Sequence, residues 1–342
     1  MNKILVIIPY FGTLPNYFQA FLNSCRNTQL LDFLLITDDQ TEYDYPDNYR
    51  VEEMSFQKLQ ALVKKKLGKQ AYIKHPYKLC DYKSLYGYFF EDYTSGYGFW
   101  AHSDIDLIFG DIDPILEELN YTQYDRVFPY GHFSIYRNND KMNRLFRKKL
   151  PSEFPKYFNI DFVKLTTYPC HFDEVGINII IKEQGLSFFE ENRHININLS
   201  YYNFSVGNGK HTNPRIICYD SGKLITVEKM IDGTFDEKNY LYVHLQGRQF
   251  SQNLVPTTDR YVISRDGFID YADDQRELYF AKYGLNNNTA AQHEFVKNFV
   301  IKAKEGQKKK ILRELKAYPM RGIYNIYHRY ESIKYLKKHN LF

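Results

Sequence analysis

The most informative stretch of the chain runs Phe99-Trp-Ala-His-Ser-Asp104-Ile-Asp106-Leu-Ile-Phe-Gly110. Two apolar segments, each with the composition of a buried strand, flank two carboxylates that are separated by a single residue. Because side chains at positions i and i+2 of an extended segment point to the same side, Asp104 and Asp106 can converge on one divalent cation, which favours hard oxygen ligands. The pattern Asp-x-Asp alone is common, and a solvated turn is the alternative. The flanking strands favour a metal site at the edge of a sheet.

The same pattern recurs at Asp111-Ile-Asp113, but its context is different. Pro114 follows directly, and Ile115, Leu116 and Leu119 keep the spacing of one helix face. Asp113 therefore reads as the N-cap of a helix that has proline at its first position. We assign this second pair a structural role.

Composition indicates a globular protein. The 342 residues are 44% hydrophobic and 25% charged, enough for one large domain, alone or with an appendage. The apolar run that ends at Pro9 is too short for a signal-peptide core or a bilayer span. The cysteines are scattered, with no Cys-x-x-Cys pair, which fits free thiols in a reducing compartment. We expect a cytoplasmic protein, either in solution or peripherally attached to the inner face of the cell membrane.

The carboxyl-terminal segment carries most of the positive charge. Residues 297–342 hold 13 Lys/Arg and 3 Glu, whereas the whole chain has a net charge of +4. Basic residues such as Lys308, Lys309 and Lys310 alternate there with apolar ones, the pattern of a helix that lies on an anionic membrane surface. A packed helical cap with a solvated basic face is the alternative. We expect no nucleic-acid partner.

Alternating strand and helix signals predict an α/β fold; a Rossmann-like mixed sheet flanked by helices is what the family resemblance described below implies. The expected strands cover 4–8, 33–37, 99–103 and 240–245. The expected helices cover 14–22, 55–67, 81–93, 138–150, 172–184 and 274–283, with two more at 290–317 and 324–336. We place a catalytic domain at 1–250 and a helical basic region at 251–342.

Four motifs in order resemble glycosyltransferases of the GT-A fold. They are Ile7-Ile-Pro9-Tyr10-Phe11-Gly12, Cys80-Asp-Tyr-Lys83, Asp104-Ile-Asp106 and His244-Leu-Gln-Gly247-Arg248. The resemblance covers roughly residues 3–250. It is closest to the retaining group that includes glycogenin and the bacterial lipopolysaccharide galactosyltransferases, and it extends to transferases of capsule and O-antigen clusters.

The resemblance implies a nucleotide-binding surface at the carboxyl ends of the first two strands. The loop of Pro9, Tyr10 and Phe11 would lie under the nucleotide, and Asp38 would contact the base or ribose, unless it only forms a turn. Lys83 would lie near the donor diphosphate. A solvated surface lysine is the alternative for that residue.

The resemblance also implies that His244 completes the metal site with Asp104 and Asp106. The family pattern is His-x-x-Gly-x-Lys, in which the lysine binds the diphosphate. Here the basic residue, Arg248, follows Gly247 directly, one position before the place of the family's lysine. This donor set suits Mn²⁺ or Mg²⁺, and the imidazole favours manganese.

Candidates for contact with the sugar lie between these motifs. Asp173, Glu174 and Asn178 correspond to a family element that binds donor-sugar hydroxyls or lies beside the anomeric carbon, although Asp173 could instead be a helix N-cap. His132 lies on a segment of the kind that lines the donor or acceptor pocket. If the reaction inverts the anomeric centre, Asp173 or Glu174 is the candidate base.

The predicted function is metal-dependent transfer of a hexose, galactose ahead of glucose, from a UDP-sugar. The acceptor would be a glycan or lipid-linked oligosaccharide in surface polysaccharide synthesis, and motif order favours retention. A sugar nucleotidyltransferase needs a glycine- and Arg/Lys-rich amino-terminal loop, which Ile8-Pro-Tyr-Phe-Gly12 is not. A glycoside hydrolase would need neither the metal nor the nucleotide loop. A non-catalytic glycan-binding module remains open.

Overall fold

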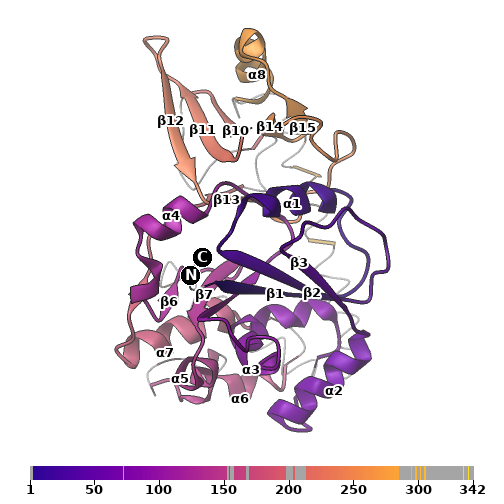
Figure 1. Cartoon of the computed structure of the whole chain (residues 1–342), viewed down its shortest axis with the longest axis vertical. Coiled ribbons are helices and arrows are strands. Elements are labelled where there is room, and N and C mark those ends of the chain that lie inside the picture. The colour runs from indigo at the N-terminus through magenta and orange to yellow at the C-terminus, as the bar shows by residue number, and fades with distance from the viewer. Residues whose placement is uncertain are drawn as a thin grey trace.

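The computed structural model describes most of the chain up to residue 284. The described residues are 3–71, 73–151, 154, 158–166, 169–197, 203–204 and 213–284, with isolated positions 294, 297, 298, 301, 304, 305, 334 and 338. The predicted α/β class is confirmed, since a seven-stranded mixed sheet has helices on both faces (Figure 1).

The main sheet has the strand order β3-β2-β1-β4-β7-β6-β8. Strands β1 to β4 run parallel, β7 is antiparallel to β4, β6 is antiparallel to β7, and β8 runs parallel to β6. Their bounds are Ile4–Tyr10 (β1), Leu31–Thr37 (β2), Tyr49–Glu53 (β3), Phe99–Ser103 (β4), Arg126–Val127 (β6), Phe133–Arg137 (β7) and Phe188–Phe189 (β8).

Alternate residues of β1 enter two different hydrophobic cores. Ile4, Val6 and Ile8 pack on the side of α1 (Phe18–Ser24) and α4 (Asp113–Glu118). Leu5 and Ile7 pack on the opposite side. The helices there are α2 (Phe56–Leu67), α3 (Tyr86–Phe89), α5 (Asp140–Asn143), α6 (Ile160–Val163) and α7 (Ile177–Glu183). A strand buried on both faces accounts for the unbroken apolar run in the sequence.

The helix predicted at 81–93 is not a single α-helix. A 3-10 helix spans Pro76–Leu85 and only one turn of α-helix follows in α3. Within it Lys78 Nζ contacts Asp81 Oδ2 at 2.5 Å, and Asp81 Oδ1 accepts a hydrogen bond from the Cys170 amide at 2.8 Å. Most of this segment is buried, charged residues included, so tertiary contacts rather than an amphipathic pattern determine its shape.

Two other predicted helices are shorter or interrupted. The segment 138–150 contains α5 and a 3-10 turn, Leu145–Arg147. The segment 172–184 begins as a π-helical turn, Phe172–Gly176, and continues as α7. Such π turns often occur at functional sites, and this one carries two of the predicted carboxylates.

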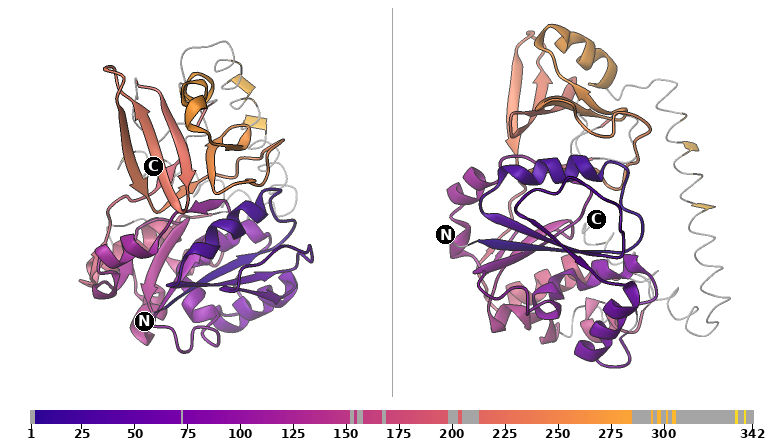
Figure 2. Two further views of the ribbon diagram at one scale, coloured as in Figure 1. Left: turned by 45° about the horizontal axis from the view of Figure 1, so that its top comes forward. Right: turned by 45° about the vertical axis from the view of Figure 1, so that its right-hand side comes forward.

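A second sheet lies above α1 in Figures 1 and 2. Its order is β12-β11-β10-β14-β15, all antiparallel, and α8 (Arg276–Tyr283) packs against it. The bounds are Arg215–Asp220 (β10), Lys223–Lys229 (β11), Phe235–Tyr240 (β12), Arg260–Ser264 (β14) and Gly267–Asp270 (β15).

The second sheet corrects the predicted boundary at residue 250. We expected a helical region at 251–342, but β14 pairs with β10 and β15 pairs with β14, so a cut at 250 would divide this sheet. The expected helix at 274–283 corresponds to α8. The basic pattern at 308–338, apart from Lys334 and Lys338, lies outside the described residues.

Three short strands connect the two sheets. In β5 (Leu107–Phe109), β13 (Tyr242–His244) and β9 (Ile195–Asn196), β13 is central, antiparallel to β5 and parallel to β9. This arrangement brings three distant parts of the chain to one place beside the end of β4.

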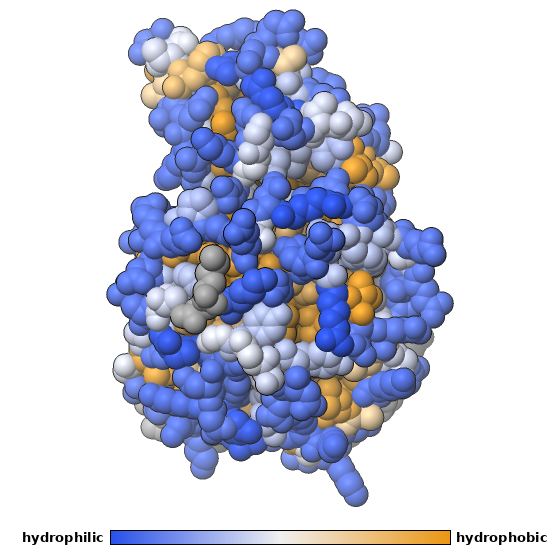
Figure 3. Space-filling model, in the orientation of Figure 1, coloured by the Kyte–Doolittle hydropathy of each residue, from blue (hydrophilic) through white to orange (hydrophobic). Residues whose placement is uncertain are grey.

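The described surface has no unusual apolar feature on the face of Figure 3, where hydrophilic residues predominate and apolar ones form separate patches. Scattered apolar residues are normal on a protein surface. Among the described helices, none is long and apolar enough to cross a membrane.

Candidate metal centre

Asp104 and Asp106 lie in the connection between β4 and β5, and backbone hydrogen bonds fix this turn. The Asp104 amide donates to the His132 carbonyl at 2.8 Å, and the Asp106 carbonyl accepts from the Leu245 amide at 2.8 Å. The Asp106 side chain is also held, because its Oδ2 accepts from the Gly247 amide at 2.6 Å. The turn therefore presents both carboxylates in defined positions.

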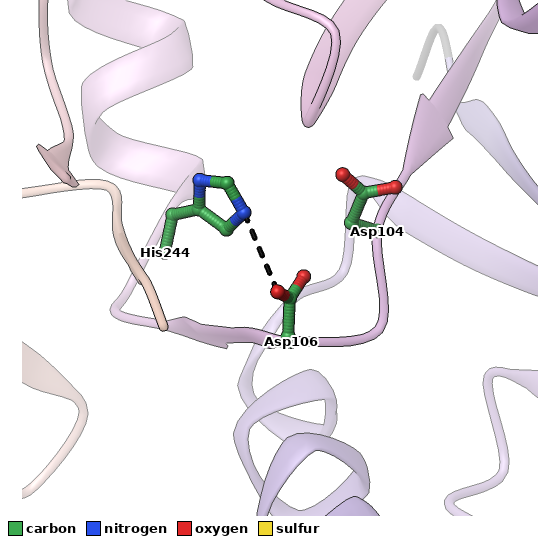
Figure 4. Close-up of side chains that lie close together, drawn as sticks. All are labelled: Asp104, Asp106 and His244. Atoms are coloured by element: carbon green, nitrogen blue, oxygen red, sulfur yellow. Dashed lines mark ion pairs between the residues drawn. The ribbon is translucent and has the colours of Figure 1, made fainter. Parts of the chain in front are cut away.

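His244 ends β13, directly opposite Leu107 of β5. This register brings its ring to the carboxylates, with Nε2 3.4 Å from Asp106 Oδ2 (Figure 4). One ligand atom from each of Asp104, Asp106 and His244 lies within 4.8 Å of the other two. The three residues predicted to bind one ion are thus together, although 138 positions separate Asp106 from His244.

Asn196 orients the histidine. It pairs with His244 across β9 and β13, and its Oδ1 lies 3.1 Å from His244 Nδ1. Because Oδ1 is an acceptor and also receives a hydrogen bond from Gln246 Nε2 at 2.5 Å, Nδ1 carries the proton. Nε2 is then the nitrogen that faces the carboxylates, as in a metal-ligating histidine supported by a hydrogen-bonded neighbour. Sequence reasoning missed Asn196, because only the strand register reveals it.

Lys83 supplies a positive charge to the same place. Its Nζ lies 2.5 Å from Asp104 Oδ1 and 2.8 Å from the Gly131 carbonyl oxygen. Burial disfavours the charged ammonium, but the Asp104 and Asp173 carboxyls outweigh it and raise the pKa of Lys83. Lys83 is a buried cation and not the solvated surface lysine of the alternative.

The pKa of Asp106 moves in the direction that suits a ligand. Burial opposes ionisation of Asp106, yet hydrogen bonding with His244 and from the Gly247 amide lowers the pKa of its carboxyl below the ordinary value. Asp106 is therefore ionised at neutral pH and able to bind a cation.

A cavity of about 450 Å³ opens beside these residues. It has the size of a small-molecule site. Seven predicted residues line it from four parts of the chain: Pro9, Tyr10, Phe11, Lys83, Asp104, Asp106 and Gly247. Tyr17, Tyr77 and Gln249 also line it and were not predicted; Tyr77 is 72% exposed.

Asp38 has the turn role that was its alternative. It is exposed, and its Oδ1 accepts from the Gly12 amide at 2.8 Å, which ties the end of β2 to the loop after β1. It does not line the cavity. The contact instead positions the loop of Pro9, Tyr10 and Phe11.

Asp173 and Glu174 lie inside the π-helical turn and pack against Gly131. A Cβ atom at Gly131 would lie 2.5 Å from Asp173 Oδ2 and 2.8 Å from Glu174 Oε1, and Glu174 Oε1 accepts from the Gly131 amide at 2.9 Å. Asp173 is not the N-cap of this turn, a position that belongs to His171. Burial, followed by the charge of Glu174, raises the pKa of Asp173 well above its ordinary value.

Two predicted binding residues have other partners. Asn178 Oδ1 accepts from the buried Arg126 guanidinium, and Asn178 Nδ2 donates to the Pro129 carbonyl at 3.0 Å. The Arg248 guanidinium lies over the Phe204 ring, 5.2 Å from its centroid. Neither residue lines the cavity. In the family pattern the lysine stands two positions after the glycine, where this chain has Gln249. Gln249 does line the cavity, whereas Arg248, one position earlier, is turned away from it.

His132 lies behind His244 rather than in the cavity. The two rings are 4.5 Å apart, and His132 Nδ1 is 2.9 Å from the Tyr242 hydroxyl. Burial and the neighbouring His244 lower the pKa of His132 well below its ordinary value, so the ring is neutral. His132 therefore supports the candidate ligand instead of contacting a substrate.

Comparison with known proteins gives one family match. Residues 6–272 match a family described as of unknown function, DUF6625. No curated protein matches the chain. The matched span includes the main sheet, the Asp104, Asp106 and His244 cluster and the second sheet, and it covers well over half of the sequence. The chain belongs to the DUF6625 family.

Proposed function

We propose that this protein is a metal-dependent glycosyltransferase that moves a hexose from a UDP-sugar to a glycan or lipid-linked oligosaccharide. One observation carries the proposal. Asp104 and Asp106, two members of the cluster that His244 completes, line a cavity that is also lined by a buried lysine and by the loop after the first strand. Metal ligands, a cation and an aromatic surface are the groups that a nucleoside diphosphate requires. The motif order shared with GT-A glycosyltransferases supports the same conclusion.

The ligand atoms of Asp104, Asp106 and His244 fit a divalent metal ion. Two carboxylates and an imidazole whose Nδ1 is held by Asn196 offer oxygen and nitrogen ligands that suit Mn²⁺ or Mg²⁺. When bound, such an ion supplies electrostatic stabilisation of the charge that develops on a leaving diphosphate.

The chain's own residues would bind and orient the donor. Tyr10 and Phe11 offer aromatic surface to the nucleoside, and Lys83 offers its ammonium to the phosphates. Because the cavity wall shields Lys83 from water, its charge acts more strongly than it would on the surface.

The carboxyl pair at the π-helical turn favours a retaining reaction. Burial raises the pKa of Asp173 well above its ordinary value, which favours the protonated carboxyl over the carboxylate that a general base requires, and Asp173 does not line the cavity. Front-face attack needs no protein base, because the acceptor proton passes to the departing phosphate. Glu174, whose pKa is lowered by His171 and by the Gly131 amide against the effect of burial, is the remaining candidate base for inversion.

We further propose that the protein acts in the cytoplasm at the inner face of the cell membrane, on surface polysaccharides of the capsule or O-antigen type. The basic carboxyl-terminal segment supports this location through attraction to anionic lipids.

Hydrolysis of UDP-galactose and UDP-glucose without acceptor tests the proposal. We expect slow release of UDP that needs Mn²⁺ and is lost in Asp106→Ala. The matched control Asp111→Ala removes an exposed carboxylate from the neighbouring Asp-x-Asp and should retain activity. A preference for GDP- or dTDP-sugars would contradict the donor assignment. Glycan binding without any turnover would favour the non-catalytic module.

A further inference from the structure

Lys83 and a metal ion would compete for the same carboxylate. The Lys83 ammonium contacts Asp104 Oδ1 at 2.5 Å, and Asp104 is one of three residues able to hold the ion. The lysine side chain is 11% exposed and that of Asp104 is 32% exposed. Water therefore cannot easily replace Asp104 as the partner of the buried ammonium.

An ion that coordinates Asp104, through either oxygen, would draw on the charge of that carboxylate and so weaken its ion pair with the Lys83 ammonium. Among the described residues, Lys83 Nζ also donates to the Gly131 carbonyl, which is polar but uncharged. The ammonium would also face a divalent cation a short distance away, and like charges in a site of low dielectric repel strongly. A ligand with two or more anionic oxygens can resolve both difficulties, because it can contact the ion and the ammonium together.

We propose that Lys83 makes metal binding conditional on an anionic ligand: the ammonium holds Asp104 until a diphosphate takes its place as the partner of Lys83. This inference rests on the proposed function and adds a condition under which the site binds its ligands. Metal and diphosphate bind as a pair, and either alone binds weakly. Coupling of this kind is reciprocal, so each ligand raises the affinity of the other by the same factor.

The charge of Lys83, rather than its shape, is the source of this coupling. Lys83→Met keeps the unbranched side chain and removes the competitor for Asp104. We expect its affinity for Mn²⁺ alone to rise, by about 5- to 150-fold if the coupling is of ordinary size. The increase in Mn²⁺ affinity that UDP causes should be smaller in Lys83→Met than in the wild type. A lysine that only contacts phosphate would change UDP affinity and leave the affinity for Mn²⁺ alone unaltered.

Lys66 provides a matched control. Its Nζ also pairs with a carboxylate and a backbone carbonyl, Glu91 Oε1 at 2.6 Å and the Tyr88 oxygen at 2.7 Å, and its side chain is 16% exposed. It does not line the cavity. Lys66→Met therefore removes a similar ion pair and should leave Mn²⁺ binding unchanged.

The experiment is titration calorimetry of Mn²⁺ into the full chain, alone, with saturating UDP and with uridine, which lacks phosphate. UDP should tighten Mn²⁺ binding to the wild type and uridine should not. Lys83→Arg keeps a cation next to Asp104 and should bind Mn²⁺ alone as weakly as the wild type. Thermal melting shows whether each variant is folded. If Lys83→Met does not fold, the comparison of the wild type with Lys83→Arg remains. Tighter binding of Mn²⁺ alone by Lys83→Arg than by the wild type would then count against the proposal.

Two failures can be told apart. If the wild type binds both Mn²⁺ and UDP but Lys83→Met binds Mn²⁺ alone no more tightly, the competition is refuted and the proposed function stands. In that case another group, such as Asp173, would neutralise the ammonium. If the wild type binds neither ligand, the proposed function itself falls, and this inference falls with it.

Discussion

Replacing Asn196 by leucine should weaken metal binding although Asn196 is not a metal ligand. The substitution keeps the approximate shape and removes the only side-chain acceptor that the described structure gives to His244 Nδ1, at 3.1 Å. The His244 side chain is 14% exposed, so water cannot readily replace that acceptor, and either nitrogen can then carry the proton. Loss of such a partner typically costs about 10- to 100-fold in metal affinity, or about 1.4–2.8 kcal/mol.

The assay is calorimetric titration of Mn²⁺ in the presence of UDP, with thermal melting to show that the fold is retained. Asn196→Asp keeps an acceptor and should preserve most of the affinity. Asn239→Leu makes the same exchange at an exposed position of β12 and should have no effect on Mn²⁺. If Asn196→Leu binds Mn²⁺ as tightly as the wild type, His244 is not oriented in this way.

Four other outcomes follow from the same geometry. Asp106→Ala should abolish Mn²⁺-dependent UDP binding, measured by calorimetry, with little change in melting temperature; unaltered binding would remove Asp106 from the site. Asp173→Asn should gain stability relative to the wild type as pH rises from about 4 towards neutrality. The reason is that the pKa of Asp173 is higher in the folded state than its unfolded value of about 3.9, so the wild type loses stability as pH rises above that value. Melting curves at several pH values test this, and a difference in stability that does not change with pH would contradict it. Gly87→Ala should destabilise the protein by about 1–3 kcal/mol, because the added methyl overlaps the Trp100 ring; denaturant melts measure the loss, and Mn²⁺ affinity per folded molecule should not change. Truncation after Asn288 should abolish sedimentation with anionic vesicles in low salt, whereas equal sedimentation of the truncated and full chains would exclude the tail as an anchor.

Local pattern was sufficient to predict the centre of the fold. The apolar runs at 4–8 and 99–103 became adjacent parallel strands, and the two carboxylates follow the second of them. His244 was predicted from the order of the family motifs. The sequence around a single histidine does not show that its strand will pair with β5. Asn196 could not be predicted, because its role depends on the register between β9 and β13.

The errors have physical causes that differ from one another. The segment at 81–93 has helical spacing, but it is buried on most sides, so packing replaced the expected α-helix by a 3-10 helix. The strands β14 and β15 did leave a signal, since Asp266-Gly267 separates two apolar runs as in a hairpin, yet we predicted a helical region there. Arg248 was proposed as the basic residue of the family pattern, shifted by one position, whereas the chain beyond Gly247 brings Gln249 to the cavity.

Anomalous diffraction from crystals grown with Mn²⁺ and UDP would test the central claim most directly. We predict one strong manganese peak in contact with Asp104, Asp106 and His244 Nε2, with the diphosphate between the ion and the Lys83 ammonium. A manganese peak elsewhere, or UDP bound in another cavity with no ion at these three residues, would contradict the account.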